Sequence, residues 1–227
     1  MKDVFMLHGA LGARTDFDAL SDLLKNDFRL HTLDFYGHGA ASFSDDFGMK
    51  AFADQVREYL TQNALKQPLV FGYSMGGYVA LYLESQYPGS FESIMTLGTK
   101  FNWNPEGSQR EAAMLNPEKI LEKVPKYAAV LEATHGEKWK QLCEETAKMM
   151  LALGDQPLFT ESDAAALNLP VRLGLGDSDK MVSLEETSKM FRALSTGTLS
   201  VLPGTPHPIG QVNPVLLASE LKHFWQG

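Results

Sequence analysis

The stretch VFGYSMGGYVALYL (residues 70–83) places one serine, Ser74, between Gly72 and Gly76 in the pattern G-x-S-x-G. A short apolar run precedes this pattern and a run with helical apolar spacing follows it, which predicts a strand, a sharp corner and a helix. Glycines flank the serine because larger side chains would clash in so sharp a turn. Ser74 is therefore either a nucleophile aimed outward from the carboxyl end of a sheet or a small residue in a tight turn.

The composition describes an ordinary globular chain with an acidic balance. The 227 residues are 44% apolar and 21% charged, and 28 acidic against 20 basic side chains give a net charge of −8. This balance repels nucleic acid and anionic membranes, so we expect a small-molecule substrate and neither of those partners, and we leave a homo-oligomer open. One cysteine, Cys143, cannot form an internal disulfide, and the four apolar residues between Asp3 and His8 are too few for a signal peptide. We expect a cytoplasmic protein.

Strand-like and helix-like segments alternate along most of the chain. The predicted strands are 3–7, 29–33, 68–72, 93–97, 170–175 and 198–202. The predicted helices are 15–26, 49–65, 75–86, 184–194 and 213–226. This alternation predicts a single domain over 1–227, with a doubly wound, mostly parallel sheet of about six strands covered on both faces.

The interval 100–163 breaks this alternation, since it contains helical patterns and no convincing strand. It predicts a helical lid inserted in the domain, or alternatively a helical satellite at the sheet edge. Its apolar side chains, among them Trp139 and Met150, would contact the substrate or form the core of the lid itself. Lys100 and Trp103 follow the fourth predicted strand and would favour a carboxylate-bearing or aromatic substrate if they face the pocket, although we expect Lys100 at the surface.

Polar side chains follow the predicted strands at the edge where open α/β sheets bind ligands. The segment HGALG (8–12) suits backbone amides that approach an oxyanion, or a simple glycine-rich turn. Two aspartates, Asp177 and Asp179, follow the fifth strand, and His207 follows the sixth. The other five histidines fall in less suitable places, so His207 is the favoured general base.

Five motifs together resemble the lid-bearing α/β-hydrolases. They are HGALG (8–12), DFYGHGAAS (34–42), GYSMGG (72–77), GDSDKMV (176–182) and GTPH (204–207). The resemblance implies that Ser74 is the nucleophile, His207 the base and Asp179 the acid, in the order that such sheets use. It also implies oxyanion-hole amides from Ala10 and Met75. Two departures are the missing leading antiparallel strands of that fold and the proline after His207, which restricts the histidine to an extended conformation.

The resemblance implies hydrolysis of an ester or thioester of a small to medium acyl group through an acyl-enzyme, with no metal and no cofactor. Alternatives are a carbon–carbon bond hydrolase or an acyltransferase that uses the same serine, or a ligand receptor on this fold with slow turnover. Dehalogenase and epoxide hydrolase chemistry is disfavoured because those relatives carry aspartate at the serine position. No G-x-G-x-x-G opens a helix and no H-E-x-x-H is present, which disfavours nicotinamide and zinc enzymes.

Overall fold

The computed structural model describes residues 1–226, and its centre is a sheet of six parallel strands in the order β2-β1-β3-β4-β5-β6. The strands are β1 (Asp3–Leu7), β2 (Arg29–Thr32), β3 (Leu69–Tyr73), β4 (Ser93–Leu97), β5 (Val171–Gly176) and β6 (Gly197–Leu202). Each predicted strand is confirmed to within one residue at either end. The predicted α/β fold with a mostly parallel sheet is therefore confirmed, and every strand pair in it is parallel.

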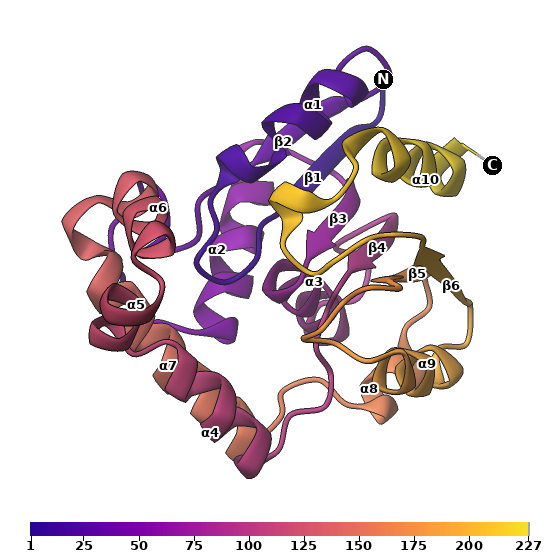
Figure 1. Ribbon diagram of the computed structural model, residues 1–227. Coiled ribbons are helices and arrows are strands. Elements are labelled where there is room, and N and C mark those ends of the chain that lie inside the picture. Colours follow the sequence, from indigo (N-terminus) through magenta and orange to yellow (C-terminus); the bar gives the residue numbers. More distant parts are fainter. Residues whose placement is uncertain (227) are drawn as a thin grey trace.

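Helices cover both faces of this sheet (Figure 1). They are η1 (Arg14–Phe17), α1 (Asp18–Leu24), α2 (Met49–Gln62), α3 (Met75–Gln86), α9 (Leu184–Ala193), η3 (Ile209–Gln211) and α10 (Pro214–Gln226). Successive residues of a strand point to opposite faces, so Phe5 and Leu7 join the core under α2 and α3 while Val4 and Met6 join the core under α1 and α10. The predicted helix 49–65 ends three residues early because Ala64 adopts a left-handed φ of 52°.

Between β4 and β5 the chain forms a helical insertion. Its helices are α4 (Pro105–Met114), α5 (Pro117–Lys123), α6 (Pro125–His135), η2 (Gly136–Lys138), α7 (Trp139–Asp155) and α8 (Glu161–Ala166). Asn104 and Asn116 cap α4 and α5, and a proline occupies the first turn of each helix, so the starts are specified locally. Figure 1 shows α4 to α7 gathered beside the sheet, and we call these four helices the cap; α8 packs on α3 and α9 instead.

The strand order locates the edge at which a ligand would bind. From β1 the chain moves outward to β2 and then returns to β3, which pairs with β1 on its other side in the register Leu7↔Gly72. The segments that follow β1 and β3 therefore leave the sheet side by side at a topological switch point, the place where open α/β sheets bind ligands. None of the helices in residues 1–226 has the length and apolar character needed to cross a membrane.

Candidate active site

Ser74 occupies the corner between β3 and α3 in a strained backbone conformation. Its φ is 49°, in the left-handed region that residues other than glycine rarely adopt. The Ser74 amide donates to the carbonyl of Leu97 over 2.8 Å. The Ser74 carbonyl accepts from the hydroxyl of Thr99 over 3.0 Å. These bonds to the end of β4 hold the backbone in this conformation and present the Ser74 side chain at the sheet edge.

The two glycines of the G-x-S-x-G pattern are required by close backbone contacts. A Cβ atom at position 72 would collide with the backbone of Gly77 at the start of α3. A Cβ atom at position 76 would collide with the carbonyl of Leu7 at the end of β1. The pattern thus lets the strand, the turn and the following helix approach each other closely enough to form the corner.

His207 and Asp179 form a hydrogen-bonded pair that is almost fully buried. The distance from His207 Nδ1 to Asp179 Oδ2 is 2.7 Å, and the two side chains are 10% and 2% exposed. The other oxygen, Oδ1, accepts from the amides of Met181 at 2.8 Å and Val182 at 2.9 Å. Burial alone would raise the pKa of Asp179, but the bonds from His207 and the two amides outweigh it and hold this pKa below its ordinary value. An ionised Asp179 places the proton on Nδ1, so Nε2 is free to accept one.

The backbone around His207 is also fixed. The Tyr73 hydroxyl donates to the His207 carbonyl over 2.7 Å. Gly98, with a φ of 64°, lies so close to the pair that a Cβ there would stand 3.2 Å from His207 Nδ1 and 3.3 Å from Asp179 Oδ2. Ser74 and His207 line the same cavity, and no direct hydrogen bond joins their side chains within the described residues.

Asp177 lies two residues before Asp179 and makes different contacts. One of its carboxylate oxygens accepts from the Ser178 hydroxyl at 3.0 Å and from the Thr205 amide at 3.2 Å. Hydrogen bonds from the amide of Gly204 and from Ser178 lower the pKa of Asp177. Asp177 therefore joins the turns after β5 and β6, while Asp179 is the aspartate that contacts the imidazole.

The two predicted oxyanion donors, Ala10 and Met75, line the same cavity as Ser74. Ala10 belongs to the loop after β1, and Met75 is the first residue of α3. The amide of a first helical residue has no partner inside its helix, which leaves the Met75 N–H free for an anion. A Cβ at Gly9 would clash with the Tyr73 ring and lie 3.3 Å from Ser74 Cβ, so the loop after β1 packs directly on the corner between β3 and α3.

Three buried histidines lie in or next to the loop after β1. His8, His38 and His135 are 0%, 0% and 3% exposed. The ring centroids of His8 and His38 are 5.0 Å apart, and those of His38 and His135 are 6.0 Å apart. Burial lowers the pKa of His8 to about 4, lowers that of His38 well below its ordinary value, and lowers that of His135. All three rings are therefore neutral at pH 7.

The hydrogen bonds of His135 connect the cap to the loops at the sheet edge. His135 Nδ1 accepts from the Gly39 amide at 2.9 Å, which requires the proton on Nε2, and Nε2 donates to the Leu11 carbonyl at 3.0 Å. Lys138, three residues further on, donates to the Ala41 carbonyl. The cap therefore contacts both the loop after β1 and the loop after β2 through specific polar bonds.

The cavity beside Ser74 is small, with a volume of about 50 Å³. Ligand pockets generally start at ~300 Å³, so the cavity holds only a small group unless its walls move. Five of the chain's ten methionines contribute to the walls. They are Met49, Met75, Met149, Met150 and Met181.

Two of the three predicted substrate contacts, Trp103 and Met150, line this cavity. Trp139 does not: it is 4% exposed and packs in the core of the cap with Leu131 and Leu142. One buried stripe runs along α7, but its first turn faces α5 and α6 and only its later turns reach the sheet. The expectation of a surface Lys100 was wrong, because its side chain is 21% exposed and lines the cavity.

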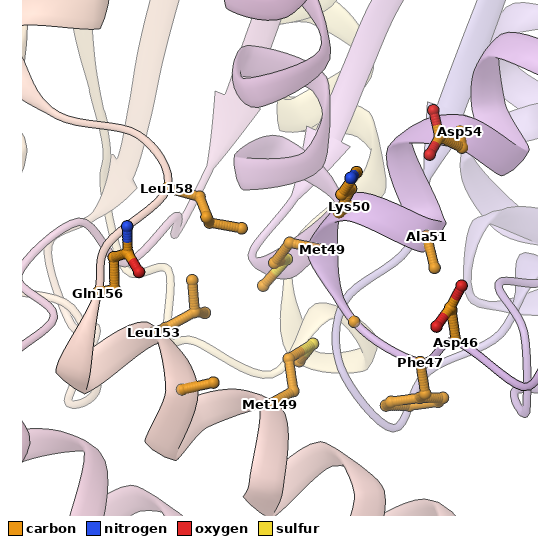
Figure 2. Close-up of a pocket in the computed structure, with 12 residues that line it drawn as sticks. Asp46, Phe47, Met49, Lys50, Ala51, Asp54, Met149, Leu153, Gln156 and Leu158 are labelled. Carbon is orange, nitrogen blue, oxygen red and sulfur yellow. The ribbon is translucent and has the colours of Figure 1, made fainter.

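A groove of about 520 Å³ lies next to the cavity, between the start of α2 and the end of α7. Met49 projects into it from α2 and Met149 from α7 (Figure 2). Both methionines also line the cavity beside Ser74, so they form the partition between the two spaces. Leu153 and Leu158 continue the apolar wall of the groove, and its rim carries charged side chains.

Comparison with known proteins identifies the family. The family model described as the alpha/beta hydrolase fold matches residues 4–137, which is more than half of the chain. The protein therefore belongs to the α/β-hydrolase fold family. Among solved structures, NosK from Streptomyces actuosus superimposes with a TM-score of 0.82 at 22% identity, covering 99% of this chain and 97% of that one. At this identity the likeness concerns the fold alone.

Two curated relatives match shorter stretches. A pimeloyl-[acyl-carrier protein] methyl ester esterase of Neisseria meningitidis serogroup C is 34% identical over 94 residues, which cover 41% of this chain and 35% of the relative. An sn-1-specific diacylglycerol lipase, ABHD11, of Mus musculus is 29% identical over 126 residues, which cover 54% of this chain and 41% of the relative. The matched segments thus span less than half the length of either relative.

Proposed function

We propose that this protein is a serine hydrolase that cleaves an ester or thioester of a small to medium acyl group through an acyl-enzyme. The observation that carries the proposal is the buried His207–Asp179 pair, with a 2.7 Å bond, whose imidazole lines the same cavity as the strained Ser74. Relatives named as an esterase and a lipase support ester hydrolysis as the reaction class.

The acylation step uses the proton positions inferred for this pair. His207 Nε2 accepts the Ser74 hydroxyl proton while Ser74 Oγ attacks the carbonyl carbon of the ester. Asp179 keeps the imidazole in the required tautomer and stabilises the imidazolium that forms. The imidazolium then gives its proton to the leaving alcohol or thiol as the carbon–oxygen or carbon–sulfur bond breaks, which leaves the acyl group on Ser74.

The negative charge of the tetrahedral intermediate is stabilised by the amides of Ala10 and Met75. Such preorganised donors contribute about 3–4 kcal/mol each in comparable sites, because they need no reorganisation during the reaction. In the second half-reaction His207 takes a proton from water, which attacks the acyl carbon and releases the acid. The proton returns to Ser74 Oγ, so the enzyme is regenerated.

We further propose that the insertion between β4 and β5 acts as a lid that selects the substrate. Met149 and Met150 of α7 line the cavity, as does Glu111 of α4. The small volume of about 50 Å³ requires these side chains to move before a longer acyl group can enter. Methionine suits this role because it is unbranched and has three rotatable side-chain bonds.

A fluorophosphonate probe tests the proposal, since it reacts only with an activated nucleophile. We expect covalent labelling at Ser74 and turnover of a short p-nitrophenyl ester in the wild type. Labelling should be absent in Ser74→Ala, should be strongly slowed in His207→Ala and His207→Asn, and should persist in Ser195→Ala, which changes an exposed serine elsewhere. Equal labelling rates in the wild type and His207→Ala would overturn the assignment.

The same assays separate the alternatives. A receptor would take up the probe slowly and fail to turn over short esters and thioesters. An acyltransferase would hydrolyse them slowly and release product faster when an alcohol or amine acceptor is added. A carbon–carbon bond hydrolase would need Ser74 for cleavage of a β-diketone-type substrate while leaving simple esters largely intact.

A further inference from the structure

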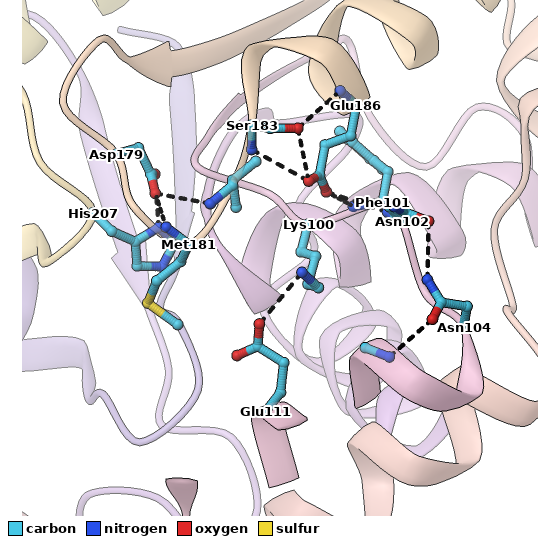
Figure 3. A network of polar contacts seen from close by, with 12 residues as sticks. Lys100, Phe101, Asn102, Asn104, Glu111, Asp179, Met181, Ser183, Glu186 and His207 are labelled. Carbon is cyan, nitrogen blue, oxygen red and sulfur yellow. Dashed lines mark hydrogen bonds and ion pairs between the residues drawn. The ribbon is translucent and has the colours of Figure 1, made fainter. Parts of the chain in front are cut away.

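The loop after β4 carries two polar side chains into the cavity and is held rigidly. Lys100 and Trp103 both line the cavity. Between them, the amides of Phe101 and Asn102 donate to one carboxylate oxygen of Glu186 in α9, at 3.0 and 3.2 Å (Figure 3). Glu186 therefore holds the loop backbone between Lys100 and Trp103 from outside the cavity.

Lys100 has hydrogen-bonding capacity to spare. Its Nζ lies 3.4 Å from Oε1 of Glu111 on α4 (Figure 3), which is longer than the 2.7–2.9 Å usual for a charge-assisted hydrogen bond. Their side chains are only 21% and 16% exposed, so the pair is partly desolvated among methionines. An ammonium group has three donors, and within residues 1–226 the ion pair with Glu111 engages one of them, which leaves two for a ligand.

Trp103 lines the same cavity and also a groove beside Glu186. Its Nε1 is buried and has no hydrogen-bond partner within residues 1–226. Lys100 Nζ lies 5.7 Å from the Trp103 ring centroid, so the ammonium and the indole share one end of the cavity. A buried donor without a partner is costly, and native proteins generally satisfy such groups, with ordered water or a ligand where protein offers none.

Building on the proposed hydrolase function, we propose that Lys100 binds a carboxylate that the substrate carries in addition to its scissile ester, with the Trp103 indole N–H as a further donor. A positive charge and unfilled donors fit an anionic acceptor, and the small cavity favours a planar carboxylate over a bulkier phosphate. Glu111 competes for the same ammonium. Removal of the Glu111 charge should therefore strengthen carboxylate binding, whereas loss of Lys100 should abolish it.

Matched substrate pairs test this site. Monomethyl glutarate and methyl pentanoate differ only by a carboxylate in place of a terminal methyl on the acyl side. β-Acetoxypropionate and propyl acetate form the corresponding pair on the alcohol side. For each pair the measured quantity is the ratio of kcat/KM for the charged ester to that for the neutral ester, at low and high salt. A preference in one pair only identifies the side of the ester that carries the carboxylate.

We expect Lys100→Met to lower this ratio about tenfold and Glu111→Gln to raise it, since the charge on the ammonium is then unshared. Salt should lower the wild-type ratio by screening. Lys66→Met, which removes an exposed lysine elsewhere, is the matched control and should keep the wild-type ratio. If Lys100→Met destabilises the protein because Glu111 is left unpaired, the double variant Lys100→Met/Glu111→Gln should fold and show the same low ratio.

If the Lys100–Glu111 contact only ties the loop to α4, each single variant should lose the same fraction of activity on the charged ester and on the neutral ester. That result, or a wild-type ratio at or below one for both pairs, overturns the carboxylate site while leaving the hydrolase proposal intact. Absence of turnover for every ester, together with absence of probe labelling at Ser74, would instead defeat the hydrolase proposal itself.

Discussion

The loops at the sheet edge and the cap beside them contribute to one cavity, but they are built differently. On the sheet side, the Ser74 amide donates to the Leu97 carbonyl at 2.8 Å and the Tyr73 hydroxyl donates to the His207 carbonyl at 2.7 Å, which fixes the backbone at Ser74 and His207. On the cap side, Met149 and Met150 form the wall through side chains that can adopt many rotamers. The difference indicates that hydrogen bonds to the backbone fix Ser74 and His207, while the shape of the cavity is adjustable.

Among changes at the sheet edge, we expect Asp179→Asn to have the largest effect on turnover. The asparagine no longer holds the imidazole in the tautomer that accepts the Ser74 proton, so we expect turnover to fall on the order of 10³–10⁴-fold with the fold retained. Asp177→Asn is the matched control: it should lower the thermal midpoint more than the rate, because Asp177 joins two turns. Turnover and thermal midpoint of both variants are the measurements, and a large rate loss confined to Asp177→Asn would contradict the assignment.

The cap has a small hydrophobic core of its own around Trp139, so truncating a side chain there should destabilise the protein. Trp139→Ala is expected to destabilise the protein by about 3–5 kcal/mol in chemical denaturation, because it leaves a large void among Leu131, Leu142 and their neighbours. The relative activities on esters of different acyl length should stay close to wild type under conditions where the variant is folded. A change in that profile without loss of stability would place Trp139 at the substrate.

The three neutral histidines predict that the free energy of unfolding falls at acid pH. One of them, His135, lies where the cap contacts the loops at the sheet edge. Because burial lowers the pKa of His8 to about 4, the folded state stays unprotonated while the unfolded chain binds protons below its pKa of about 6.5. Stability should therefore be flat above about pH 7 and fall between pH 6.5 and 4, by up to about 3 kcal/mol for His8 alone. The lowered pKa of Asp179 acts in the same sense, because the unfolded chain again binds more protons than the folded one, but it matters only below about pH 4.

Urea denaturation across this pH range checks the prediction. His135→Gln should make the acid-side slope shallower, since one buried ring is removed at the junction with the cap. His223→Gln, at an exposed position on α10, should leave the slope as it is. An equally steep slope in His135→Gln would show that this ring does not contribute to the pH dependence.

The smallest expected effect concerns the methionine partition. Met149→Ala should join the cavity to the neighbouring groove and shift the preference among p-nitrophenyl esters toward longer acyl chains by about three- to tenfold, since each buried methylene contributes ~0.8 kcal/mol. Met114→Ala, which truncates a methionine that is 58% exposed on α4, is the control and should keep the wild-type profile. Equal losses on every ester in Met149→Ala would mark this residue as structural.

The fold could be predicted from the sequence because its signals are local. Short apolar runs gave the six strands, and the alternation with helices gave a parallel sheet whose carboxyl edge collects the segments after the strands. Ser74 and His207 could be selected because each follows a strand, whereas the choice of Asp179 over Asp177 also needed the resemblance to the α/β-hydrolases. In the structure Ser74 and His207 line one cavity and Asp179 bonds to His207 behind it, and their catalytic roles remain proposed.

The cap side was less predictable because its contacts depend on how helices pack. Trp139 and Met149 lie on the same buried stripe of α7, yet one packs against α5 and α6 and the other reaches the cavity. The contact of Lys100 with Glu111 depends on which face of α4 meets the loop after β4. Helical periodicity identifies a buried face but not the element that covers it, so these placements required the structure.

The insertion leaves the sheet after β4 and returns at β5, and these two strands are hydrogen-bonded neighbours in the register Ile94↔Val171. Its two ends are therefore held close together by the sheet, whatever lies between them. The entropic free-energy cost of closing a loop grows only slowly, by about 0.6 kcal/mol for each doubling of loop length. Caps of other lengths and sequences could thus be transplanted at this point with little effect on the sheet, which would let one catalytic edge diversify toward new substrates by exchange of a single continuous segment.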